Sequence, residues 1–186
     1  MSGDSRVDDG PLLPATPRIA VVSTMSGAGK TTLAKLLASR LGVPCIELDA
    51  LHHLADWQPA PDFEQKVAIA AAQAGWVIDG NYHGRLKGSV TDAADVVLWL
   101  DLPVAVCLWR MAKRTARRIV TRKELWNGNR ETIYAAVFAR DSLFRFALST
   151  YRRRRREMPG RLAGARCVRL RSQAEVNRWL AANLTP

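Results

Sequence analysis

One segment of the sequence has the residue types and the spacing needed to bind phosphate. An apolar stretch, Ile19 to Val22, runs into a loop of small residues. Glycines let the backbone curl so that successive N–H groups point at an anion, and a following helix directs its positive end to the same place. Lys30 is then expected to reach the β- and γ-phosphates of ATP, and the Thr31 hydroxyl to ligate Mg²⁺. The residues predicted to bind the phosphates are Ser26, Gly27, Ala28, Gly29, Lys30, Thr31 and Thr32.

This loop departs at one position from the usual pattern G-x-x-x-x-G-K-[ST]. Thr24 stands where the pattern has its first glycine. We therefore expect the first turn of the loop to be wound less tightly, and the sequence leaves open whether the grip on ATP is weaker.

Three aspartates are expected at the carboxyl ends of strands, the edge at which open parallel sheets bind ligands. Asp79 ends the apolar run Trp76 to Ile78 and is predicted to hold Mg²⁺, directly or through water. Asp49 follows a second apolar run and is predicted to orient the acceptor or take its proton, with a turn or a short helix cap as the alternative. Asp101 precedes Leu102-Pro103 and is predicted to start a helix.

The elements that must position these residues alternate along the chain. Strands are predicted at 18–23, 43–48, 76–78, 95–100 and 167–170. Helices are predicted at 30–41, at 63–74 with Asp62 as its cap, from 104 onward, and after Ser172, which forms a capping box with Glu175. This order predicts an α/β fold of three layers, α/β/α, around a five-stranded parallel sheet.

Length and composition favour one domain. The first 17 residues are polar, contain three prolines and show no periodic pattern, so we expect a disordered leader at 1–17 and a single domain at 18–186. No apolar stretch is long enough to cross a bilayer, and no secretory signal is recognisable. The three cysteines, Cys45, Cys107 and Cys167, are far apart and are expected to be reduced core thiols. Together these features predict a cytoplasmic protein that is not bound to a membrane.

Positive charge is concentrated in one part of the chain. Residues 110–171 hold 19 Lys and Arg against 4 Asp and Glu, whereas the whole chain has a net charge of +11. A segment this basic attracts nucleic acid, polyphosphate substrates or an acidic partner through the same field. Composition alone leaves these partners undecided.

Four stretches together resemble the P-loop nucleoside and nucleotide kinases, and within them the small adenylate-kinase-like proteins labelled topology-modulation proteins. They are the loop at 27–34, Leu48 to His52, Trp76 to Tyr82, and Val97 to Pro103 with the arginines after it. In adenylate kinases the helix after Asp-x-Pro carries two arginines, nine and thirteen positions beyond the Asp, that contact adenine and phosphates. Arg110 and Arg114 stand at these spacings from Asp101, so the resemblance implies that they act in catalysis.

The acceptor side differs from adenylate kinase. That enzyme has Gly-Phe-Pro-Arg after its third strand, whereas Gly80-Asn81-Tyr82-His83-Gly84-Arg85 follows Asp79 here, which makes AMP a doubtful acceptor. Asn81, Tyr82 and Arg85 are candidates to contact the acceptor together with Asp49, although each suits an ordinary surface loop as well. Residues 115–157 lie where related kinases insert a lid, and a helical, arginine-rich lid is expected there.

Two functions from different classes follow. The first is a phosphotransferase that uses ATP and Mg²⁺ to phosphorylate a small acceptor, such as a nucleoside or nucleotide, with Lys30, Asp79, Arg110, Arg114 and Asp49 as catalytic residues. The alternative is a nucleic-acid-associated P-loop NTPase or regulator, connected with DNA topology, that uses the basic segment 110–171. The sequence favours the first and does not identify the acceptor or the oligomeric state.

Overall fold

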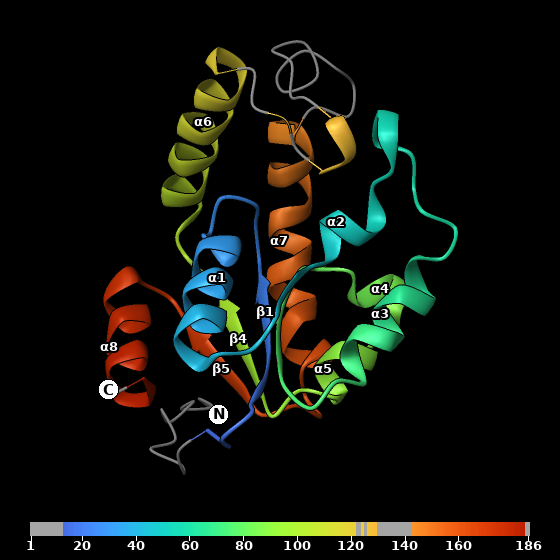
Figure 1. Ribbon diagram of the computed structural model, residues 1–186. Coiled ribbons are helices and arrows are strands. Elements are labelled where there is room, and N and C mark those ends of the chain that lie inside the picture. Colours follow the sequence, from blue (N-terminus) through green and yellow to red (C-terminus); the bar gives the residue numbers. More distant parts are fainter. Residues whose placement is uncertain (1–12, 122–123, 125, 130–142, 185–186) are drawn as a thin grey trace.

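A computed structural model of the chain describes residues 13–121, 124, 126–129 and 143–184 (Figure 1). Its centre is one sheet of five strands in the order β2-β3-β1-β4-β5. The strands are β1 (Arg18–Ser23), β2 (Cys45–Glu47), β3 (Trp76–Asp79), β4 (Val96–Leu100) and β5 (Cys167–Leu170). Every neighbouring pair is parallel, and β1 lies between β3 and β4. The predicted five-stranded parallel sheet is therefore confirmed.

Helices cover both faces of this sheet. They are α1 (Lys30–Leu41), α2 (Leu48–His52), α3 (Phe63–Ala71), α4 (His83–Leu86), α5 (Ser89–Asp92), α6 (Val104–Val120), α7 (Leu143–Arg161) and α8 (Gln173–Asn183), with 3-10 turns η1 (Ala55–Trp57) and η2 (Trp126–Gly128). Figure 1 shows α6 and the upper part of α7 rising beyond the carboxyl ends of the strands. Ligands of open parallel sheets bind at this edge.

The core is divided in two by the sheet because successive side chains of a strand point to opposite faces. Ile19 and Val21 pack with α1, α8 and the first turns of α6 on one face. Ala20 and Val22 pack with α3, α4, α5 and the end of α7 on the other. Both faces are buried, which explains why the central strands are continuously apolar in sequence.

Element boundaries differ from the prediction mainly at the second strand. Pairing covers only Cys45–Glu47, since Pro44 precedes it without an N–H to donate and Leu48 already begins α2. The short helices α4 and α5 were not predicted, because four-residue helices have no periodic pattern to detect. Asp62 does not cap α3 through its side chain and instead pairs with Lys66 at 3.0 Å, so that prediction is wrong.

The last helix begins as predicted. The Ser172 hydroxyl accepts a hydrogen bond from the Glu175 N–H at 3.2 Å. The Glu175 carboxylate accepts from the N–H of Arg171 at 2.7 Å, one residue before the position that a capping box would use.

Two predicted segments extend beyond the described residues. Most of the expected leader, residues 1–12, lies outside them. Of its described part, Leu13 packs against the core and the Pro17 carbonyl accepts from the Trp76 N–H. The expected lid at 115–157 includes the end of α6 and most of α7, while 122–123, 125 and 130–142 lie outside the described residues. No helix in the described part of the chain is long and apolar enough to span a bilayer.

Candidate functional site

The predicted phosphate-binding loop connects β1 to α1 at the carboxyl edge of the sheet. Gly27 and Gly29 have φ angles of +84° and +99°, a region that L-residues with side chains rarely adopt. Among the described residues, no acceptor takes a hydrogen bond from the backbone N–H groups of Ser26 to Thr32. A loop of free N–H groups at the start of a twelve-residue helix has the chemistry of an anion site.

Gly27 is also required because the chain passes close to α6. A Cβ atom on Gly27 would lie 2.2 Å from the carbonyl oxygen of Cys107. The loop is therefore held between α1 and the first turns of α6.

Lys30 and Thr31 extend from the end of this loop to neighbouring strands. The Lys30 ammonium donates to the Ser23 hydroxyl at 3.2 Å, and the Thr31 hydroxyl donates to Asp79 Oδ2 at 2.5 Å. Asp79 is the last residue of β3, and only 6% of its surface is exposed. The structure thus brings Lys30, Thr31 and Asp79 together, as the sequence predicted.

The surroundings of Asp79 suit a divalent cation. Burial raises the pKa of the Asp79 carboxyl, while Lys30 and the Thr31 hydrogen bond act in the opposite direction. Its Oδ1 atom is buried and has no hydrogen-bond partner among the described residues. A hard cation held by the Thr31 hydroxyl and this carboxylate would satisfy the orphaned oxygen and compensate its charge.

Thr24 fixes the start of the loop through three hydrogen bonds. Its N–H donates to the Leu100 carbonyl at 3.1 Å, and its hydroxyl donates to Asp101 Oδ1 at 2.7 Å and accepts from the Trp99 indole at 2.9 Å. Thr24 is 1% exposed and its φ is not positive. Threonine in place of the first glycine therefore bonds the start of the loop to β4 and to Asp101, which the sequence did not predict.

Asp101 does not start α6 as predicted. Its side chain is fully buried, and its Oδ2 atom accepts from Arg155 at 3.2 Å and from Arg169 Nη2 at 2.5 Å. The Arg169 guanidinium also lies 4.3 Å above the Trp99 ring. Asp101 thus joins the loop to β5 and α7. An arginine inside the apolar strand Cys167–Leu170 was the sequence signal for a buried partner.

On the acceptor side, Asp49 lies in α2, the helix that follows β2. The Tyr82 hydroxyl donates to Asp49 Oδ1 at 2.7 Å, and burial followed by the charge of Asp49 raises the pKa of Tyr82. The Tyr82 ring contacts His52 and Phe63, with centroid distances of 4.8 and 5.0 Å. The structure therefore brings the candidate acceptor residues Asp49 and Tyr82 together, and it places Tyr82 in an aromatic cluster that the sequence did not predict.

The other two predicted acceptor residues are engaged within the protein. Asn81 accepts from the Ser23 N–H and donates to the Ser23 carbonyl, both at 2.8 Å, so its amide fixes the end of β1. Arg85 is exposed; it donates to Glu64 at 3.3 Å and lies over the Phe63 ring.

Part of the expected lid contacts the acceptor side. Asn129 accepts from the Trp57 N–H at 3.0 Å and donates to the Leu54 carbonyl at 2.8 Å, and Asn127 donates to the His53 carbonyl. Asn129 is buried, so residues 126–129 are fastened to the loop 53–57. The sequence offered no signal for this contact.

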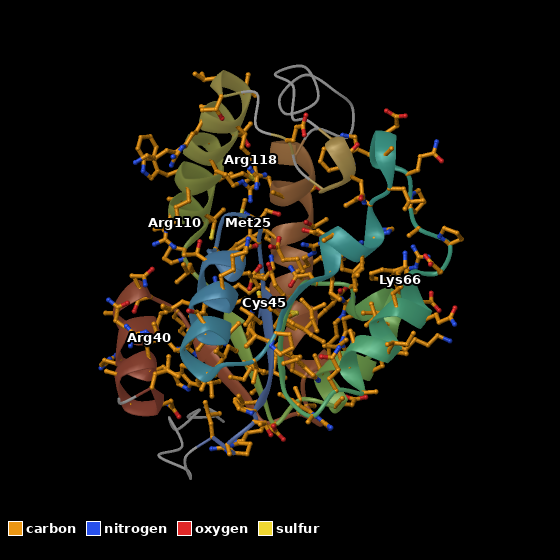
Figure 2. All side chains as sticks on the ribbon, in the orientation of Figure 1. Met25, Arg40, Cys45, Lys66, Arg110 and Arg118 are labelled. Atoms are coloured by element: carbon orange, nitrogen blue, oxygen red, sulfur yellow. The ribbon has the colours of Figure 1, made fainter. Side chains whose placement is uncertain are left out.

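Arg110 lies against the phosphate-binding loop, as Figure 2 shows near Met25. It donates to the Ala28 carbonyl at 3.3 Å and to Gln173 at 3.0 Å. Arg114 is half-buried one turn later on α6. Both arginines therefore lie on the helix that packs against the loop, on the side of α1.

The arginine run 152–156 on α7 points in several directions, as a helix requires. Arg155 binds Asp101, Arg153 lies 3.9 Å from Glu157, and Arg152 and Arg156 are exposed. Arg122, Arg130 and Arg140, which fall within the expected lid at 115–157, lie outside the described residues.

The cysteines form no disulfide, and no group of three His, Cys, Asp or Glu suited to a metal occurs among the described residues. Burial raises the pKa of Cys107, and that of Cys167 to about 11. At pH 8 about one Cys167 thiol in a thousand is then ionised, so we expect slow alkylation of Cys107 and Cys167 by iodoacetamide in the folded protein and fast alkylation in urea. Equal rates in both conditions would contradict this burial.

Comparisons with known proteins agree with this architecture. No protein-family model matches the sequence. The cytidylate kinase of Pyrococcus horikoshii is 30% identical over 118 residues, which cover 55% of this chain and 60% of that protein. The chain thus spans about 60% of the length of the curated relatives that it matches.

Solved structures of kinases share the fold. A shikimate kinase from Acinetobacter baumannii, in complex with shikimate, superposes with a TM-score of 0.52 at 17% identity, covering 90% of this chain and 96% of its own. A gluconokinase from Sinorhizobium meliloti gives 0.51 at 21% identity, covering 92% and 93%. The chain therefore has a P-loop kinase-like α/β fold.

Proposed function

We propose that this protein is a phosphotransferase that moves the γ-phosphoryl group of ATP to a hydroxyl group of a small acceptor. One observation carries the proposal: Lys30, Thr31 and a buried Asp79 with an unsatisfied oxygen meet beside a loop whose N–H groups have no acceptor among the described residues. The cytidylate kinase relatives and the kinase folds support the same reaction class.

Each residue has a role on the donor side. The loop N–H groups and Lys30 bind the donor phosphates, and Arg110 and Arg114 neutralise charge on the transferred group. Thr31 and Asp79 would hold Mg²⁺, which supplies positive charge to the phosphate oxygens when bound. These groups are oriented before the donor arrives, because Lys30 is already bonded to Ser23 and Thr31 to Asp79.

On the acceptor side, Asp49 takes the proton of the attacking hydroxyl. The acceptor oxygen forms a bond to the γ-phosphorus, the bond from that phosphorus to the bridging oxygen of ADP breaks, and the proton passes to the Asp49 carboxylate. Tyr82 holds this carboxylate through its 2.7 Å hydrogen bond. Asn81 positions the end of β1, and Arg85 remains a candidate for contact with the acceptor.

The test is transfer of labelled phosphate from ATP with Mg²⁺ to a panel of acceptors. The panel contains cytidine monophosphate, gluconate and shikimate, for which the relatives and fold neighbours are named. It also contains cytidine and glucose as neutral counterparts of the first two. At least one acceptor should be phosphorylated, and removal of Mg²⁺ with EDTA should abolish transfer. Failure of ATP to bind at all would contradict the proposal.

Replacing Asp49 by Asn keeps an acceptor atom for Tyr82 but removes the proton-accepting carboxylate. We expect kcat to fall by about 10²–10⁴-fold with the KM for ATP unchanged. Asp56→Asn is the matched control, since Asp56 is exposed in the adjoining turn and its φ of +55° suits asparagine. An equal loss in both variants, or none in Asp49→Asn, would exclude Asp49 as the base.

The alternative function, a nucleic-acid-associated NTPase, is supported by charge and by the resemblance to topology-modulation proteins. Arg155 and Arg169 are bound to Asp101, and Arg153 and Arg161 to Glu157, which reduces the number of arginines available to a phosphate backbone. Titration of duplex DNA at increasing salt separates the two functions, because absence of binding near physiological salt excludes the alternative.

A further inference from the structure

A recess lies on the α7 side of the sheet, beside the end of β1 and apart from the phosphate-binding loop. Its floor is apolar and comes from Val22, Met158 and Leu162. Its polar lining comes from Ser23, Asn81, His83, Thr91, Arg154 and Arg161. No Asp or Glu is among the described residues that line it.

Positive charge converges on this recess. Burial, followed by Arg153 and Arg161, lowers the pKa of Arg154, and burial followed by Arg161 lowers the pKa of His83. Two acidic residues outside the lining partly offset this positive charge. Glu157 lies 2.7 Å from Arg161, and Asp92 on α5 raises the pKa of His83, against the effect of burial. The Nδ1 atom of His83 is buried without a hydrogen-bond partner among the described residues. An anion would relieve the repulsion between the two guanidiniums and can pair with the imidazole.

The recess is connected to the reaction site through one residue. Ser23 lines it, and the Ser23 hydroxyl accepts from Lys30 at 3.2 Å. Asn81, which also lines it, clamps Ser23 and comes two residues after Asp79. A group held in the recess therefore lies next to the end of β1, from which the phosphate-binding loop departs.

We propose that this recess binds an oxyanion of the acceptor, a carboxylate or a phosphate monoester, through Arg154 and Arg161. The acceptor is then an anionic hydroxyl compound rather than a neutral one. This inference rests on the proposed phosphotransferase function, and the two can fail separately because anion binding is measurable without turnover.

Histidine resonances provide that measurement, since the chain has three histidines and His83 is in the recess. Titration with inorganic phosphate, and separately with gluconate, should shift the His83 signals saturably by NMR. The Arg154→Gln and Arg161→Gln variants should each weaken this binding by at least about tenfold, the effect of losing a charge-assisted hydrogen bond. Arg152→Gln is the matched control, because it removes the same charge from an exposed position of the same helix. Lys30→Ala should leave the shift intact, which distinguishes the recess from the phosphate-binding loop.

Transfer assays connect the recess to the acceptor. Cytidine monophosphate and gluconate should be better acceptors than their neutral counterparts cytidine and glucose. If cytidine monophosphate is phosphorylated, the oxyanion is a phosphate; if gluconate is phosphorylated, it is a carboxylate. Arg154→Gln should raise the KM for that acceptor about tenfold and leave the KM for ATP unchanged. No His83 shift in the wild type, an equal shift in Arg154→Gln, or equal use of the neutral compounds would each overturn the inference. Anion binding without any transfer would overturn the proposed function and leave only the anion site.

Discussion

Replacing Lys30 by Ala should reduce phosphoryl transfer at least a hundredfold. Lys30 is the cation of the predicted phosphate-binding loop, and removal of one preorganised donor to a developing charge costs about 3–4 kcal/mol. Within the described residues the variant loses the 3.2 Å hydrogen bond to the Ser23 hydroxyl and the positive charge that acts on Asp79, and neither joins separate core elements, so the fold should be maintained. The measurement is kcat/KM for ATP, with thermal unfolding as the check on folding.

Lys35→Ala is a matched control for this variant. Lys35 belongs to the same helix and carries the same charge, but its side chain is 61% exposed and it pairs with Glu47 at 2.7 Å. We expect its activity to stay within about twofold of the wild type, because an exposed ion pair contributes about 1 kcal/mol or less to stability and Lys35 lies away from the loop. Unchanged turnover in Lys30→Ala would refute the phosphotransferase proposal.

Replacing Asp101 by Asn should have the largest effect on stability. Asp101 accepts from Thr24 with one oxygen and from Arg155 and Arg169 with the other. In one orientation the new NH₂ group faces the two guanidiniums, which are donors as well. In the other it faces the Thr24 hydroxyl, whose hydrogen then loses its acceptor, and in both orientations the arginines lose the negative charge that they pair with. We expect a loss of about 2–4 kcal/mol, toward the lower end because both arginines are partly exposed and can be hydrated. Denaturant titration measures this loss.

The same variant should also bind ATP more weakly, because Thr24 begins the phosphate-binding loop. Asp95→Asn provides the comparison, since Asp95 is an exposed aspartate that precedes β4 and accepts from the Arg18 N–H, a bond that asparagine can keep. If both variants unfold at the same denaturant concentration, Asp101 does not hold the loop, β5 and α7 together.

Local patterns were sufficient to predict the donor side of the site. Gly27, Gly29, Lys30 and Thr31 are contiguous, and the strand before them and the helix after them are read directly from periodicity. Asp79 could be placed opposite them because parallel strands end at the same edge, and β3 does pair with β1. The fold class followed from the same alternation of strands and helices.

Tertiary structure decided the roles that depend on partners distant in sequence. Thr24 and Asp101 are 77 residues apart, and Asp101 and Arg169 are 68 apart. Sequence reasoning treated Thr24 as a departure from the loop pattern and Asp101 as a helix start because both interpretations used only neighbouring residues. The contact between Asn129 and the loop 53–57 and the basic recess beside Ser23 likewise arise from packing between separate elements.

The sequence by itself was sufficient to predict a phosphate-binding loop at the end of β1, since a loop with obligatory backbone conformations and a fixed lysine can be encoded in a few adjacent residues. Only the tertiary structure decided how that loop is anchored and which basic residues line the recess next to it. The physical reason is that the electrostatic energy of a buried charge such as Asp101, or of clustered charges such as Arg154 and Arg161, depends on the groups that surround it in space.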